Sequence, residues 1–122
     1  AGLGFNTYPL MGQQLLADAA TTIVPFWINL FENGAMVQFI HRWLGFLVLL
    51  SIITVFAVAL SQVKSRRVSQ AATWVLGLVL VQFLLGVLTL INYVPLYLAL
   101  AHQVFACLVL LGAAYLLYIV RD

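Results

Sequence analysis

Two histidines, His41 and His102, are the residues of this sequence best suited to chemistry. Each lies inside a long apolar stretch, about seven residues from its beginning. An ionisable side chain in such a stretch is costly to hold in a membrane and by default marks a functional site. Neutral imidazole is also a common ligand of iron and other transition metals. A site that uses both histidines requires that the fold bring them together.

Three apolar stretches can supply that fold, over residues 34–63, 69–91 and 96–120. The first and third must run in the same direction, because two short connections join the three stretches. At ~1.5 Å per residue, both histidines then lie roughly 10 Å below the same membrane surface. The sequence therefore predicts that His41 and His102 are level with each other.

The expected distance between the first and third helices favours a large, flat ligand. Neighbouring helices pack ~8–10 Å apart, so that a diagonal pair in a four-helix bundle is ~12–14 Å apart. That distance is too long for two imidazoles to share a bare metal ion, but it admits a macrocycle with one imidazole on each face. We therefore predict a heme iron with His41 and His102 as its axial ligands. The alternative is that each histidine only forms a hydrogen bond between helices.

Residues near the histidines agree with this prediction. Small residues that would leave room for a porphyrin lie one turn from each histidine, at Gly45, Ala99 and Ala106. Small residues also let membrane helices approach closely without any ligand, so they do not decide the matter. Gln38 lies one turn before His41 and is predicted to point at the same site. Arg42 is predicted to pair with a heme propionate or with Glu32.

Other polar or reactive residues of the apolar stretches have simpler roles. On the second stretch, Gln82, Gly86 and Thr89 share a helical face that is expected to look into the bundle, where polar groups hold helices together. Cys107 is expected to be a small buried residue. The sequence contains no phosphate-binding loop, no Ser-His-Asp set and no cysteine cluster. No carboxylate lies within an apolar stretch, so a proton relay or ion transport has little support.

The composition places the chain in a lipid bilayer. It is 66% hydrophobic and 7% charged, whereas soluble domains are about a quarter charged. The net charge of +2 does not indicate nucleic acid, because four of the five basic residues lie at the ends of apolar stretches. A single cysteine excludes an intrachain disulfide. The chain does not begin with a signal peptide, and its start at Ala1 is expected to be that of a fragment or one half of a longer protein.

The fold class expected is an all-α integral membrane protein with three spans of an up-down four-helix bundle. Residues 36–122 form the transmembrane unit, and residues 1–35 form a loop that lies against the bilayer. Its stretch from Pro25 to Asn33 is aromatic and amphipathic, which is typical of the headgroup level; an unstructured tail is the alternative. Three basic residues at 64–67 and Arg121 place that end of the helices in the cytoplasm or matrix. Residues 1–35 are then extracytoplasmic, in a bacterial plasma membrane or a mitochondrial inner membrane.

Four stretches of the sequence together resemble the C-terminal half of the heme A synthase family. They are AGLGFNTYPLM, NLFENGAMVQFIHR, VQFLLGVLTL and LALAHQ, which cover nearly the whole chain in the right order. The resemblance implies an eight-helix membrane oxidoreductase, built from two four-helix halves, that oxidises a methyl group of heme O to the formyl group of heme A for terminal oxidases. It implies that His41 and His102 ligate heme b. The first helix of this half, the N-terminal four-helix half and heme O synthase become expected partners.

One position departs from the pattern of the family. In its N-terminal half, a glutamate implicated in catalysis stands three residues before the first histidine, where this chain has Gln38. The resemblance therefore assigns this chain to the cofactor-binding half and leaves its catalytic residues unknown. The paired extracytoplasmic cysteines of the family have no counterpart in residues 1–35. A membrane b-type cytochrome that only carries electrons is the alternative function, and a structural subunit without a cofactor is the third.

Overall fold

The computed structural model describes residues 4–121, which are helical with irregular connections and contain no strand in that range. Six helical segments follow one another: η1 Asp18–Thr21, η2 Phe26–Ile28, α1 Asn29–Glu32, α2 Gly34–Gln62, α3 Arg66–Ile91 and α4 Leu96–Arg121. The last three are 29, 26 and 26 residues long and apolar enough to cross a membrane. At ~1.5 Å per residue each exceeds the ~30 Å hydrocarbon core.

The helix boundaries lie close to those of the predicted spans, except at the start of α3. This helix begins at Arg66, three residues earlier than the predicted 69. The hydroxyl oxygen of Ser65 accepts a hydrogen bond from the backbone N–H of Val68 and so caps the first turn. The basic residues of the connection therefore belong partly to the helix.

The α2 helix begins in a network of two asparagines. The side-chain oxygen of Asn33 accepts from the N–H groups of Ala35 and Met36, at 3.0 and 3.5 Å. Its amide nitrogen donates to the carbonyl of Ala19 and to the side-chain oxygen of Asn29. Asn29 is fully buried. This network joins the segment before the membrane helices to the first turn of α2.

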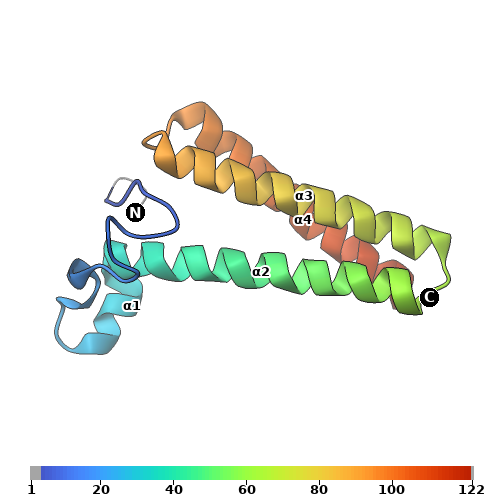
Figure 1. Ribbon diagram of the computed structural model, residues 1–122, viewed down its shortest axis with the longest axis horizontal. Coiled ribbons are helices and arrows are strands. Elements are labelled where there is room, and N and C mark those ends of the chain that lie inside the picture. Colours follow the sequence, from blue (N-terminus) through green and yellow to red (C-terminus); the bar gives the residue numbers. More distant parts are fainter. Residues whose placement is uncertain (1–3, 122) are drawn as a thin grey trace.

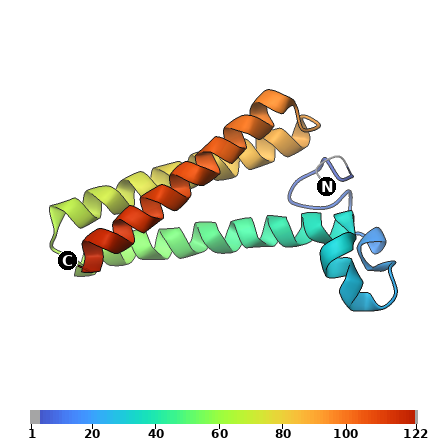
Figure 2. The same ribbon diagram turned by 180° about the vertical axis from the view of Figure 1, so that it is seen from behind.

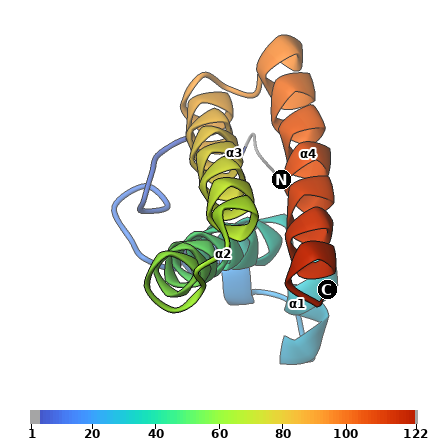
Figure 3. The same cartoon turned by 90° about the vertical axis from the view of Figure 1, so that its right-hand side faces the viewer.

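The three long helices alternate in direction, and α3 packs against both α2 and α4 (Figures 1 and 3). Their basic end, which carries Lys64, Arg66, Arg67 and Arg121, is closely packed. Its core consists of small and branched apolar residues: Ala59, Val68, Ala71, Ala72, Val75, Leu116 and Ile119. Toward the opposite end, α2 diverges from the α3–α4 pair (Figures 1 and 2). We call that opposite end the histidine end, because His41 and His102 lie in its half of the helices.

Outside the site, the sequence predicted an aromatic segment on the membrane surface and a buried Cys107. Phe26, Trp27 and Phe31 are exposed, as a segment lying on a bilayer requires, and its place on a membrane surface stays a prediction. The expectation that Cys107 is buried is wrong, because its side chain is exposed. Ala106 lines the cavity described below, and the next residue of a helix points about 100° away from it.

Candidate functional site

His41 of α2 and His102 of α4 face each other at the histidine end. Their ring centroids are 6.3 Å apart and their ring planes are inclined by 85°. Helix α3 contacts both of the helices that carry them (Figure 3), and the two rings lie in a cavity that residues of all three helices line. The expectation that the two imidazoles lie level with each other agrees with this distance.

The His102 ring is held in one orientation by α3. Its Nδ1 atom is 3.1 Å from the carbonyl oxygen of Gln82. A carbonyl oxygen can only accept a hydrogen bond, so Nδ1 carries the proton and the lone pair lies at Nε2. Gly86 makes room for this arrangement, because a β-carbon there would stand 2.9 Å from Cε1 of His102. A backbone carbonyl on the second ring nitrogen is the usual way in which proteins orient a ligating histidine.

The His41 ring is less constrained. It is exposed, and it faces the ring of His102. Gly45 lies one turn further along α2, where a β-carbon would be in ordinary contact, 3.9 Å from Phe83.

A cavity of about 620 Å³ surrounds the two imidazoles. Its floor is apolar, since Val48, Val79 and Val109 each lie seven residues deeper than His41, Gly86 and His102 respectively. Seven residues are two helical turns, or ~10 Å. Its wall on α3 contains the predicted inward-facing set of polar and small residues: Gln82, Gly86 and Thr89. The cavity is thus apolar toward the basic end and more polar near the histidines.

Residues 5–10, which we call the strap, cross from α2 to α3 at the histidine end. Arg42 holds them by donating hydrogen bonds to four strap carbonyls: Thr7 (2.6 Å), Leu10 (2.9 Å), Phe5 (2.9 Å) and Pro9 (3.1 Å). Asn6 donates to the carbonyl of Leu90 on α3 at 2.9 Å. The Arg42 side chain is only 7% exposed. The expected pairing of Arg42 with Glu32 is wrong, because its two terminal nitrogens bond to backbone carbonyls instead; the alternative pairing with a heme propionate stays a prediction.

Gln38 also bonds to the strap. Its amide nitrogen donates to the Phe5 carbonyl at 2.6 Å, and its side chain is 5% exposed. It lines the cavity as predicted, but its donor is used by the protein itself. Gln38 and Arg42, the two predicted polar neighbours of His41, therefore both donate hydrogen bonds to the strap.

Tyr8, on the strap, completes the cavity wall and was not singled out from the sequence. Its ring stacks on Phe46 of α2 with centroids 5.8 Å apart and meets Phe83 of α3 edge-on at 6.0 Å. The Arg42 guanidinium carbon lies 5.9 Å from the centre of this ring. Burial raises the pKa of the Tyr8 phenol, while the charge of Arg42 acts weakly in the opposite direction.

Four buried polar atoms in residues 4–121 have no hydrogen-bond partner, and all four belong to residues that line this cavity. They are Tyr8 Oη, Gln38 Oε1, Arg42 Nε and Gln82 Oε1. Buried polar groups are nearly always satisfied in folded proteins, so each exception needs an explanation. Their concentration around one cavity indicates that something polar belongs inside it.

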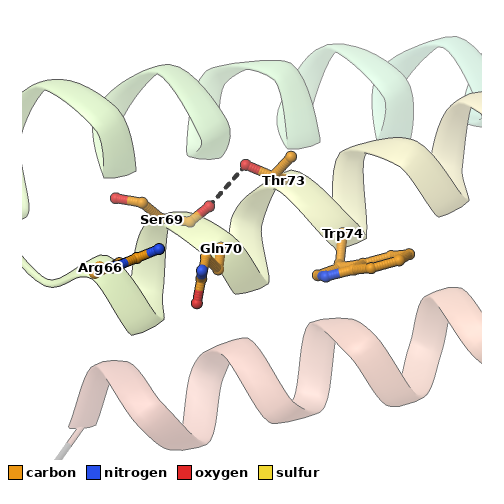
Figure 4. Close-up of a pocket in the computed structure, with 5 residues that line it drawn as sticks. All are labelled: Arg66, Ser69, Gln70, Thr73 and Trp74. Carbon is orange, nitrogen blue, oxygen red and sulfur yellow. Dashed lines mark hydrogen bonds between the residues drawn. The ribbon is translucent and has the colours of Figure 1, made fainter.

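A second hollow, of about 360 Å³, lies on α3 at the basic end (Figure 4). It is formed by five side chains: Arg66, Ser69, Gln70, Thr73 and Trp74. The Thr73 hydroxyl donates to the carbonyl of Ser69 at 2.8 Å, and none of the unpartnered buried atoms named above lies here. The histidine cavity is therefore the better candidate for a functional site.

The residues able to bind a metal in the cavity are the two histidines. Over residues 4–121, no group of three or more His, Cys, Asp or Glu side chains comes together. Two imidazoles leave most coordination positions of a transition metal to other donors.

Sequence comparison places this chain among known proteins. The family model described as cytochrome oxidase assembly protein matches residues 1–114. The chain belongs to this family. Two similar relatives are both described as heme A synthase. That of Wolbachia pipientis wMel is 37% identical over 121 residues, and that of Azorhizobium caulinodans is 44% identical over 117 residues.

These alignments cover 99% and 93% of this chain but only 33% and 32% of the relatives. A heme A synthase from Brucella anthropi, 39% identical over 110 residues, is matched to the same partial extent. This family member thus spans about a third of the length of its curated relatives. No solved structure matches the chain.

Proposed function

We propose that this chain is the heme b-binding C-terminal half of a heme A synthase, the membrane oxidoreductase that converts a methyl group of heme O to the formyl group of heme A. In this proposal His41 and His102 are the axial ligands of the heme iron. The observation that carries it is the distance and angle between the two imidazole rings. Family membership and the names of the relatives support the enzyme class.

The distance between the rings suits one iron bound on both faces. A metal–nitrogen bond of ~2.0 Å on each side, plus ~1.2 Å from each nitrogen to its ring centre, gives about 6.4 Å between the centroids. The observed separation is 6.3 Å.

The donor set and the cavity suit a tetrapyrrole. The described residues supply two nitrogen ligands at the site and no third side chain, and a porphyrin supplies the remaining four nitrogens of an octahedral iron. The cavity volume of about 620 Å³ is within the ~300–1,000 Å³ usual for cofactor sites. An iron porphyrin between two imidazoles supplies one-electron transfer when bound. The residues of this chain would hold it, orient it and exclude water.

Gln38 supports the division of labour within the proposed enzyme. Its amide does not titrate, and its donor nitrogen is bonded to Phe5. A group fixed in this way offers no general acid or base, which supports the part of the proposal that assigns the oxidation of heme O to another part of the full-length protein. By the positive-inside rule, the basic end lies in the cytoplasm and the strap is extracytoplasmic.

The absorption spectrum of the purified protein tests the proposal. A low-spin, bis-histidine b-type spectrum is expected, and it should be lost in both His41→Ala and His102→Ala. Gln103→Ala is the matched control, since Gln103 follows His102 and is exposed. A folded protein that remains colourless when heme is supplied, or a spectrum that survives both histidine substitutions, would overturn the assignment.

A further inference from the structure

The strap is part of the wall of the histidine cavity, although it precedes the first membrane helix in sequence. It is bonded to α2 through Arg42 and Gln38 and to α3 through Asn6. A segment needed only as a connection would not be held by six hydrogen bonds from three side chains. Its position has the effect of bringing Tyr8 to the cavity.

The cavity has two chemically distinct ends along the helix axes. Val48, Val79 and Val109 form its floor, whereas Tyr8 and Arg42 lie at the histidine end. A molecule that fills both ends has an apolar body and a polar edge. The apolar body faces the valines and the polar edge faces the strap.

The atoms left at the strap favour an acidic edge. Arg42 retains one unpartnered donor, Nε, and the Tyr8 hydroxyl is also unpartnered and closed off from bulk water. A hydroxyl and a guanidinium N–H both donate to a carboxylate, and hydrogen bonds to a charged group are the stronger ones. The described residues place no carboxylate of the protein in the cavity wall.

Resting on the proposed function, we propose that Tyr8 is a ligand-contacting residue whose hydroxyl donates to the carboxylate edge of the bound iron porphyrin. Arg42 is the positioning residue, which holds Tyr8 in place through the carbonyls of the strap. The porphyrin is thereby oriented with its acidic edge toward the strap and its apolar edge toward the three valines.

The rate of porphyrin loss to an excess of apomyoglobin tests the role of Tyr8. Tyr8→Phe keeps the ring and its stacking on Phe46 but removes the hydroxyl, and iron protoporphyrin should then be lost about tenfold faster. The bis-histidine spectrum should remain. Tyr97→Phe is the matched control, because Tyr97 is 72% exposed and is absent from the cavity wall; it should not change the rate.

A porphyrin without free acids identifies the atoms that Tyr8 contacts. With the dimethyl ester of iron protoporphyrin, whose carbonyl oxygens accept only the weaker neutral hydrogen bond, Tyr8→Phe should change the rate of ligand loss much less. If Tyr8→Phe changes the rate equally for the acid and the ester, the hydroxyl does not contact the carboxylates. If Tyr8→Phe behaves as Tyr97→Phe with the free acid, while both keep the bis-histidine spectrum, the inference fails and the proposed function stands. A wild-type protein without that spectrum would instead refute the proposed function.

A double-mutant cycle separates positioning from direct contact. Arg42→Lys retains the charge but cannot serve four carbonyls, so it should speed porphyrin loss and abolish most of the additional effect of Tyr8→Phe. Strictly additive effects of the two substitutions would mean that Arg42 does not act through Tyr8. Faster hydrogen exchange of strap amides in Arg42→Lys, measured on the same samples, is required as well; unchanged exchange would rule out the positioning role.

Discussion

A β-carbon at Gly86 would lie 2.9 Å from Cε1 of His102, closer than two carbon atoms approach in folded proteins. Helix α3 therefore positions His102 in two ways. The carbonyl of Gln82 accepts a hydrogen bond from Nδ1, and Gly86, one turn away, has no side chain to collide with the ring. The imidazole of His102 fills the space that a side chain at position 86 would occupy.

Gly86→Ala is expected to displace the His102 ring and weaken ligation. Under the proposed function, porphyrin affinity should fall at least about tenfold, since a misplaced ring would lose part of its bond to the iron and its hydrogen bond to Gln82. Gly77→Ala on the same helix, where nothing lies within 4 Å of the added carbon, should leave affinity unchanged. Heme titration of the apoprotein distinguishes the two variants, and equal affinities would contradict the steric role of Gly86.

Tyr8 is expected to ionise at a higher pH than a free tyrosine side chain. Burial raises the pKa of its phenol and the Arg42 charge opposes this only weakly. The chain has five tyrosines, so a spectrophotometric titration should show a late phenolate step that is missing in Tyr8→Phe. Because the folded pKa is raised, the stability linked to Tyr8 is present below about pH 10 and is lost as the pH rises through the folded pKa. A titration curve whose late phenolate step is unchanged in Tyr8→Phe would contradict this prediction.

Replacing Tyr93 by glycine is expected to stabilise the protein. It lies in the turn after α3 with φ of 61°, in the left-handed region that costs a residue with a β-carbon roughly 1–2 kcal/mol. Tyr93→Gly should raise the free energy of unfolding by about 1 kcal/mol after the entropy lost by glycine is counted. The comparison is Tyr97→Gly, equally exposed at 72% but in the first turn of α4, which should destabilise by about 1 kcal/mol. Thermal unfolding in detergent measures both, and a loss of stability at both positions would exclude strain at Tyr93.

Asn33→Ala is expected to be strongly destabilising. It removes the cap of α2 and leaves the carbonyl of Ala19 and the buried side chain of Asn29 each without one partner. A lost cap alone costs about 1 kcal/mol, and an unsatisfied buried group adds about 1–3 kcal/mol. Glu32→Ala next to it, at an exposed position, should change stability by less than about 0.5 kcal/mol. Denaturant unfolding of the two variants provides the test, and similar midpoints would refute the role of the asparagine network.

Periodicity and depth along the chain predicted the helices and the level of the two histidines. Apolar stretches of this length have few alternatives in a membrane, and short connections fix the directions of consecutive helices. The inward face of Gln82, Gly86 and Thr89 followed from the same helical spacing. These are properties of single helices and their neighbours, which the local sequence encodes.

The partners of Arg42 could not be predicted in this way. Its hydrogen-bond acceptors are backbone carbonyls 32 to 37 residues away, and a carbonyl has no signature in the sequence. Every residue offers one, so an argument from side-chain types favoured Glu32. The early start of α3 was missed for a related reason, since a serine cap extended the helix into the basic connection. Tyr8 was not predicted as a site residue, because its contacts depend on where the strap crosses from α2 to α3.

The hydrogen bond from Asn6 to the Leu90 carbonyl joins residues that are 84 positions apart. A membrane protein is synthesised from its N-terminus, so the strap is made well before the carbonyl at the far end of α3 to which Asn6 donates. His102 arrives later still, with α4. In the order of synthesis, His41 and the strap therefore both precede α3, and His102 is added only with α4. A nascent chain interrupted before α4 would contain the strap and His41 but would lack the imidazole that faces His41 in the folded protein.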